Sequence, residues 1–207
     1  MSMENILELQ QVSKTFSKSN FALENVTFSL PYGSILGFVG ENGAGKTTLI
    51  RLLCGLQQPT SGELSLYGTL HSQPQIQNAR KRIGAVVETP SIYLDMTAEE
   101  NLRQQFQILG LPSYREISGL LQLVGLQDTG KKKAKHFSLG MRQRLGIAIA
   151  LCGNPDFLIL DEPVNGLDPQ GIIEIRELIL KLNRERQITF LISSHISVSY
   201  THLRAHE

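Results

Sequence analysis

The sequence predicts an α/β fold: a mostly parallel sheet, an N-terminal antiparallel β subdomain and a helical subdomain inserted at about residues 95–153. Three observations lead to this prediction. The runs 157–160 and 188–192 are almost wholly apolar, which is typical of parallel strands covered on both faces. The glycine-rich segment 40–48 lies between an expected buried strand at 34–39 and a helical pattern. Helix-capping patterns are concentrated in the stretch between the earlier and the later strands.

The first part of the chain favours a small antiparallel sheet. Apolar residues recur over 6–12 and 22–30, and the second run closes with the turn residues Pro31–Gly33. A further turn at 59–62 precedes an expected edge strand over 63–68, and residues 83–87 are expected to form a buried strand.

The segment from Gly40 to Thr48 has the form G-x-x-x-x-G-K-[ST], a phosphate cradle. Its glycines let backbone N–H groups point inward at an anion, because no Cβ intervenes. Lys46 would supply a charge to the terminal phosphates and Thr47 a hydroxyl to Mg²⁺, while the following helix directs its positive dipole end at the same phosphates. The segment therefore predicts a P-loop core that binds a nucleoside triphosphate. The candidate residues are Gly40, Glu41, Asn42, Gly43, Ala44, Gly45, Lys46, Thr47 and Thr48.

The helical block begins with two expected capping boxes. Thr97 and Glu100 have the required hydroxyl-x-x-carboxylate spacing, and so do Ser113 and Glu116. Each predicts a helix, and the glycines at 110 and 125 are expected to end them.

Two carboxylates follow the apolar run 157–160. Asp161 and Glu162 stand where a buried strand ends, at the sheet edge where ligands gather in open α/β folds. Asp161 is expected to hold Mg²⁺ through a water. Glu162 is expected to polarise the water that attacks the γ-phosphate, because one carboxylate does not perform both tasks.

Three further positions belong to the expected site. His195 ends the last predicted strand, next to the other strand ends, and is a candidate for a γ-phosphate contact. Asp168 and Pro169 have the N-cap and N1 identities of a helix start, which needs no function to explain it. Ser138 would cap another helix whose N-terminus forms a second anion site, serving the nucleotide of another copy; the alternative is an ordinary capped core helix.

Composition limits the other possibilities. With 207 residues and a formal net charge of +1, the chain gives no electrostatic argument for nucleic acid, and the basic run 131–135 is expected to be a solvated connector. Cys54 and Cys152 lie in apolar helical patterns and are expected to be reduced core thiols. No stretch reaches the roughly 20 apolar residues of a membrane span, so the protein is expected in the cytosol or facing it on a membrane partner.

With these motifs in order, the chain from about Ile6 to His195 resembles the ATP-binding subunit of an ABC transporter. Residues 40–47 resemble its Walker A loop, 157–161 its Walker B strand and 165–168 its D-loop. By this resemblance Glu162 is the catalytic glutamate, His195 the switch histidine and Asp168 a D-loop residue at the nucleotide. Phe16 stands where the family stacks an aromatic ring on adenine, with packing in the small sheet as the competing role. The resemblance implies a RecA-like P-loop NTPase core that uses ATP and Mg²⁺.

Two departures from the family pattern carry information. The family signature Leu-Ser-Gly-Gly-Gln is here Phe137-Ser-Leu-Gly-Met141, which keeps Ser138 and Gly140 as phosphate contacts to a partner's nucleotide. Glu88 stands where the family generally has a glutamine that touches Mg²⁺ and the transmembrane partner. Glu88 with the segment 89–93, together with the segment 138–145, resembles the bacitracin and lantibiotic protection exporters of Gram-positive bacteria.

The resemblance implies a homodimer that sandwiches two ATP molecules and drives a separate membrane-spanning permease from the cytoplasmic face of the membrane, with no nucleic acid partner. Export of an antibiotic or antimicrobial peptide, and hence antibiotic resistance, is the expected function. Two alternatives stay open: a soluble ABC ATPase acting on ribosomes or DNA, and a nucleotide switch of low turnover, motivated by Leu139, Met141 and Glu88.

The last ten residues resemble the read-through of a transposase adapter used in sequencing libraries. We therefore expect residues 1–197 to form the nucleotide-binding domain, incomplete at its C-terminus, and 198–207 to be a non-native tail in which His202 and His206 have no role.

Overall fold

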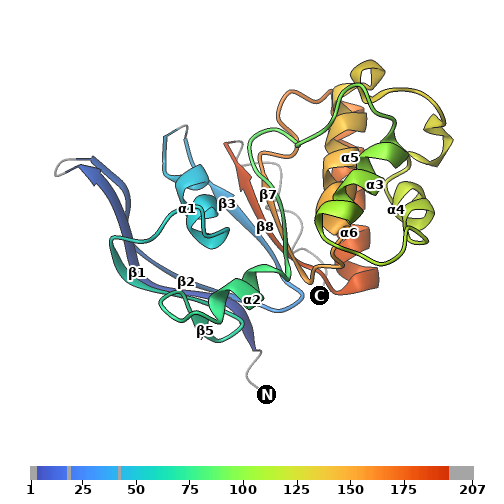
Figure 1. Ribbon diagram of the computed structural model, residues 1–207. Helices are drawn as coiled ribbons and strands as arrows, with labels where there is room; N and C mark the ends of the chain where they lie inside the picture. The colour runs from blue at the N-terminus through green and yellow to red at the C-terminus, as the bar shows by residue number, and fades with distance from the viewer. Residues whose placement is uncertain (1–3, 18–19, 42, 196–207) are drawn as a thin grey trace.

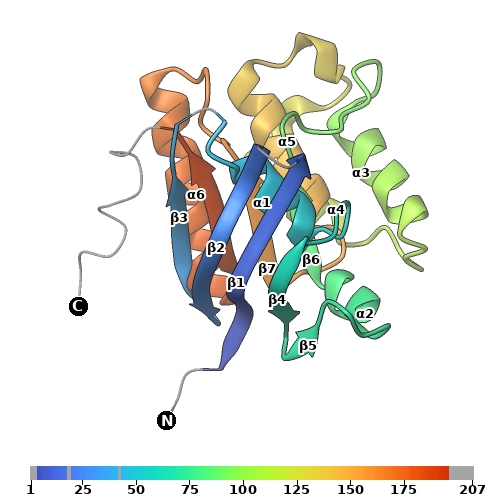
Figure 2. The same ribbon diagram turned by 90° about the vertical axis from the view of Figure 1, so that its left-hand side faces the viewer.

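The computed structural model describes residues 4–17, 20–41 and 43–195, and in these it forms two sheets with helix α1 (Lys46–Leu53) between them (Figures 1 and 2). The predictions for Asn42 and for the tail at 198–207 fall outside the described residues.

The first sheet is antiparallel, as predicted. In the described residues it has four strands in the order β2-β1-β4-β5: β1 (Asn5–Ser17), β2 (Asn20–Pro31), β4 (Ser61–Leu66) and β5 (Thr69–Leu70). The expected edge strand at 63–68 is wrong, because β4 pairs with β1 on one side and β5 on the other. The chain reverses at Gly68, whose φ of +71° suits glycine, and the short β5 thereby becomes the edge.

The second sheet is parallel. Its four strands in the described residues are β3 (Ile35–Val39), β6 (Ile83–Val86), β7 (Phe157–Asp161) and β8 (Thr189–Ser194), in the order β3-β8-β7-β6. The central pair β7 and β8 is buried throughout, which confirms the prediction from their apolar runs. The expectation of full burial at 34–39 and 83–87 is wrong, since β3 and β6 form the two edges among the described strands and Val39 is 44% exposed.

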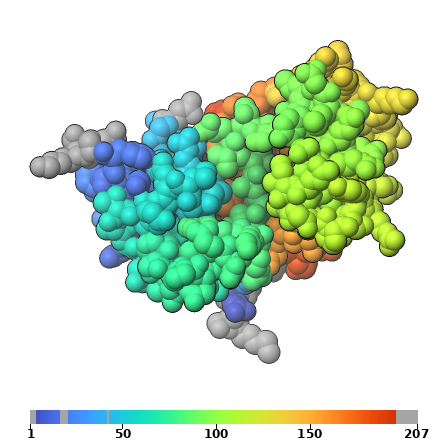
Figure 3. All heavy atoms as spheres, viewed as in Figure 1, coloured from blue at the N-terminus to red at the C-terminus, as the bar shows by residue number. Residues whose placement is uncertain are grey.

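The helical block covers one side of the parallel sheet. It contains α3 (Ala98–Ile108), α4 (Ile117–Leu123) and α5 (Leu139–Leu151), together with the 3₁₀ turns Gln127–Thr129 and Ala134–His136. The remaining helices are α2 (Ile76–Arg80) and α6 (Pro169–Arg186), and α6 packs beside α5 (Figure 1). In the space-filling view the helical block and the antiparallel sheet with α1 occupy opposite sides of the molecule (Figure 3).

One of the two predicted capping boxes forms. The Thr97 hydroxyl accepts from the Glu100 N–H at 3.2 Å and the Glu100 carboxylate accepts from the Thr97 N–H at 2.7 Å, so α3 begins as predicted. The second prediction is wrong. The Ser113 hydroxyl instead accepts from the Arg115 N–H at 3.3 Å, and a turn delays the start of α4 to Ile117, which leaves Glu116 as an N-cap without a side-chain bond.

The alternation of β7 divides the core into two clusters. Phe157 and Ile159 pack with α1 and the antiparallel sheet, whereas Leu158 and Leu160 pack with the helices on the other face. Both faces of the central strands are therefore apolar, and the fold fixes their carboxyl ends beside the N-terminus of α1 (Figure 1).

The remaining expectations from composition concern the thiols and the membrane. Cys54 and Cys152 are free thiols, and burial raises the pKa of Cys54 to about 11 and that of Cys152 to about 12. Within the described ranges no helix combines the length and the apolar character that crossing a membrane requires.

Candidate functional site

The glycine-rich loop connects β3 to α1 and needs glycine for two different reasons. Gly43 and Gly45 have φ values of +86° and +85°, in the left-handed region. A Cβ on Gly45 would in addition lie 2.1 Å from the Ala22 carbonyl oxygen, since the backbone of β2 passes directly behind the loop. Gly45 is the N-cap of α1 and offers no side-chain cap, so the helix presents its N-terminal N–H groups to an anion.

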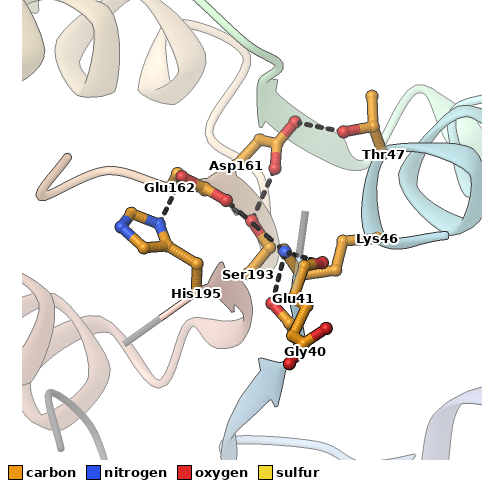
Figure 4. A network of polar contacts seen from close by, with 8 residues as sticks. All are labelled: Gly40, Glu41, Lys46, Thr47, Asp161, Glu162, Ser193 and His195. Atoms are coloured by element: carbon orange, nitrogen blue, oxygen red, sulfur yellow. Dashed lines mark hydrogen bonds and ion pairs between the residues drawn. The ribbon is translucent and has the colours of Figure 1, made fainter. Parts of the chain in front are cut away.

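Lys46 lies at the centre of this loop. Its side chain is 6% exposed, and its Nζ donates to the carbonyl oxygens of Gly40 at 2.6 Å and Glu41 at 2.9 Å (Figure 4). Glu162 Oε1 lies 3.6 Å from the same nitrogen. The ammonium group is thus held inside the curled loop, where it would neutralise phosphate charge.

Thr47 and Asp161 come together from segments far apart in the sequence. The Thr47 hydroxyl donates to Asp161 Oδ2 at 3.3 Å, and Asp161 is 5% exposed at the end of β7. Both groups offer hard oxygen ligands, and Mg²⁺ typically takes one or two protein oxygens together with phosphates and waters. The pair therefore fits a magnesium ion bound with a nucleotide.

Glu162 and His195 form the other side of the site. The Glu162 carboxylate is joined by Oε2 to His195 Nδ1 at 2.7 Å and by Oε1 to Lys46, as Figure 4 shows. The backbone of Glu162 has a φ of +47°, which is uncommon for a residue with a side chain and is associated with functional sites.

A cavity of about 310 Å³ collects most of these groups. Phe16 and Phe21 are 57% and 55% exposed, so packing in the antiparallel sheet does not account for either ring. Sequence reasoning singled out Phe16 but missed Phe21, which pairs with Thr15 across the β1–β2 hairpin and thus lies next to Phe16. The cavity is lined by Phe16, Phe21, Ala22, Gly43, Gly45, Lys46, Thr47, Thr48 and Glu162.

The signature segment lines a different cavity, of about 370 Å³, at the N-terminus of α5. The Ser138 hydroxyl caps α5 by accepting from the Met141 N–H at 3.2 Å, and Asp168 caps α6 by accepting from the Gly171 N–H at 3.0 Å. Gly140 lines the same cavity, but none of these residues lines the cavity of the glycine-rich loop. The structure brings Ser138, Gly140 and Asp168 together and leaves them apart from Lys46 and Thr47.

Glu88 follows β6, and its side chain forms an ion pair with Arg51. Its Oε1 accepts from the Arg51 guanidinium at 2.5 Å, and the side chains of Glu88 and Arg51 are 58% and 41% exposed. A Glu88 contact to Mg²⁺ stays a prediction.

Comparison with known proteins identifies the family. A family model for ABC transporters matches residues 23–165. The chain belongs to this family. Among curated ABC relatives, the bacitracin transport ATP-binding protein BcrA of Bacillus licheniformis is 46% identical over 194 residues, which are 94% of this chain and 63% of that protein. The lantibiotic transport ATP-binding protein SrtF of Streptococcus pyogenes is 41% identical over 198 residues, 96% of this chain and 83% of that protein.

The chain therefore spans less than two thirds of the length of BcrA. Solved ABC structures agree with the fold: cbiO1 of Clostridium perfringens matches with a TM-score of 0.83 and 28% identity, covering 93% of this chain and 79% of that one. The dimeric ATP-binding cassette MJ0796, in a post-hydrolysis state bound to ADP and Pi, matches with a TM-score of 0.79 and 25% identity, covering 93% and 89%. The predicted fold class and the family resemblance are both confirmed.

Proposed function

We propose that this ABC family member is the ATP-binding and ATP-hydrolysing subunit of an exporter of peptide antibiotics. The observation that carries the proposal is the meeting of Lys46, Thr47, Asp161 and Glu162 beside one cavity, in a chain 46% identical to BcrA. ATP and Mg²⁺ are the proposed cofactors.

Different residues of the site would bind Mg²⁺, orient the phosphates and accept the proton. Thr47 and Asp161 would hold Mg²⁺, which when bound would neutralise phosphate charge. Lys46 would orient the terminal phosphates. When the nucleotide binds, the Lys46 ammonium would donate its hydrogen bonds to phosphate oxygens in place of the carbonyl oxygens of Gly40 and Glu41. Glu162 would accept a proton from the attacking water at its carboxylate, and His195 would fix the carboxylate through the 2.7 Å contact.

A second copy of the chain is the proposed partner for each nucleotide. Ser138 and Gly140 line a cavity distinct from that of the glycine-rich loop, so within one chain they stand away from Lys46. The dimeric state of MJ0796 supports an arrangement in which the N-terminus of α5 completes the site of the other copy. Asp168, beside Ser138, would lie at the same junction.

The cargo and the location are proposed from the relatives. BcrA is named for bacitracin transport and SrtF for lantibiotic transport, which supports a peptide antibiotic as the exported molecule. A separate membrane-spanning permease would carry the cargo, and the chain would then sit at the cytoplasmic face of the membrane.

Phosphate release and nucleotide binding test the proposed activity. Glu162→Gln should slow phosphate release by about 100-fold or more, because the change removes the proton acceptor. ATP should still bind, because glutamine keeps the shape of the side chain. The matched control is Glu185→Gln, which neutralises an exposed carboxylate on α6 and should leave both measurements unchanged. Equal phosphate release by wild type and Glu162→Gln would contradict the proposal.

Coupling to transport needs a cellular test. Expressed together with a candidate membrane-spanning permease, the wild-type chain should protect cells against bacitracin or a lantibiotic, and Glu162→Gln should not. Recovery of the chain with ribosomes, and never with that permease, would instead favour the soluble ABC ATPase.

A further inference from the structure

Ser193 lies behind the site at the end of β8 and is only 1% exposed. Its hydroxyl donates to Asp161 Oδ1 at 2.5 Å and accepts from the Glu162 N–H at 2.9 Å (Figure 4). A hydroxyl has one proton to donate and lone pairs to accept with, so this single group serves both neighbours at once.

The bond to Asp161 fixes the direction of that carboxylate. With Oδ1 engaged by Ser193, Oδ2 is the oxygen that faces the Thr47 hydroxyl at 3.3 Å. Asp161 is itself 5% exposed, so water has little access to take over the role of Ser193. Ser193 thus selects which carboxylate oxygen is presented to a cation.

The bond from Glu162 acts on the backbone. Glu162 has a φ of +47°, a conformation that a residue with a side chain adopts only when its surroundings hold it there. The Ser193 oxygen accepts the Glu162 N–H and so stabilises that conformation. From this backbone position the Glu162 carboxylate reaches both Lys46 and His195.

We propose that Ser193 is a positioning residue that sets the orientation of the metal-binding carboxylate of Asp161 and of the proton-accepting carboxylate of Glu162 together. This inference rests on the proposed ATPase function. Ser193 is not among the residues that line the cavity of the glycine-rich loop, and it acts through Asp161, the last residue of β7, and Glu162, which follows it.

The test compares Ser193→Ala with Thr189→Val at the other end of the same strand. The Thr189 hydroxyl is also buried and accepts from the Gly33 N–H at 2.8 Å, so both changes remove a buried hydroxyl of β8, but only Ser193 adjoins the site. Each variant is assayed for thermal stability, for phosphate release, and for the affinity of a fluorescent ATP analogue with Mg²⁺ and with EDTA.

We expect Mg²⁺ to strengthen binding of the analogue by the wild type and by Thr189→Val. In Ser193→Ala the increase in affinity caused by Mg²⁺ should be about tenfold smaller, a typical effect of removing a group that orients a metal ligand. Its kcat should fall by about tenfold or more with a smaller change in the KM for ATP. Ser193→Thr, which keeps the hydroxyl, should recover most of the Mg²⁺ effect.

Two results would overturn the inference: a Ser193→Ala protein with the wild-type gain from Mg²⁺ and wild-type kcat, or the same loss in Thr189→Val, which would mark a general effect on stability. If the wild type neither binds the analogue nor releases phosphate, the proposed ATPase function fails and this inference fails with it. If the wild type binds the analogue and releases phosphate, and Ser193→Ala behaves like the wild type, the inference about Ser193 fails while the proposed ATPase function stands.

Discussion

Replacing Gly45 with alanine should destabilise the protein much more than the same replacement of Gly43. The two residues lie in the same loop with nearly equal φ values, +85° and +86°. They differ in what surrounds them: an added Cβ would lie 2.1 Å from the Ala22 carbonyl oxygen at Gly45, but among the described residues it would meet no atom within 4 Å at Gly43.

The expected magnitudes follow from these two terms. A left-handed backbone costs a residue with a Cβ about 1–2 kcal/mol, and both variants carry this cost. At Gly45 the overlap is with backbone, which does not rotate away, so overpacking adds about 1–3 kcal/mol. The free energy of unfolding should therefore fall by about 1–2 kcal/mol in Gly43→Ala and by about 2–5 kcal/mol in Gly45→Ala.

Urea unfolding without nucleotide measures the difference directly, and thermal unfolding gives a second estimate, since 1 kcal/mol corresponds to about 2–4 °C in Tm for a chain of this size. Working without ATP separates the packing effect from any loss of phosphate binding. Equal destabilisation of the two variants would refute the reasoning, because it would mean that the β2 backbone does not restrict the loop at Gly45.

Three further predictions concern the remaining structure. Thr97→Ala should lower the free energy of unfolding by about 1 kcal/mol in urea unfolding, because the Thr97 side chain caps α3. Ser113→Ala should change it by less than about 0.5 kcal/mol, because the Ser113 hydroxyl caps no helix. Burial raises the pKa of Cys54 from 9.0 to about 11 and that of Cys152 from 9.0 to about 12, so stability should be constant below pH 9 with respect to these thiols and fall as the pH rises towards 11. Unfolding measured at pH 8 and pH 10 under reducing conditions checks this, and a double Cys→Ala variant should show a shallower decline. Arg51→Met should cost less than about 1 kcal/mol in thermal unfolding, because the Arg51–Glu88 ion pair is solvent-exposed.

Local patterns predicted much of the fold because their causes are local. The uninterrupted apolar character of 157–160 requires two covered faces, and β7 is buried on both. The glycine-rich loop and the Thr97 cap depend on residues within a few positions of each other. The edge positions of β3 and β6 had no such signal, since burial at a sheet edge depends on which strand lies alongside. The Ser113 prediction failed because the Ser113 hydroxyl bonds two residues ahead instead of capping a helix.

The residues of the site also differ in whether local sequence predicts them. Lys46 and Thr47 follow from a motif, and Asp161 from its place at a strand end, but Ser193 acts on partners 31 and 32 residues earlier in the chain. Its role follows only from the register of β7 and β8, which sets Asp161 opposite Ser193. Apolarity predicts that two strands are buried and does not fix which residues face each other, because a shift of register keeps the apolar character and changes every pair. A buried serine at the carboxyl end of a strand is therefore best examined against the strand beside it, where one hydroxyl can orient the ligands that a motif names.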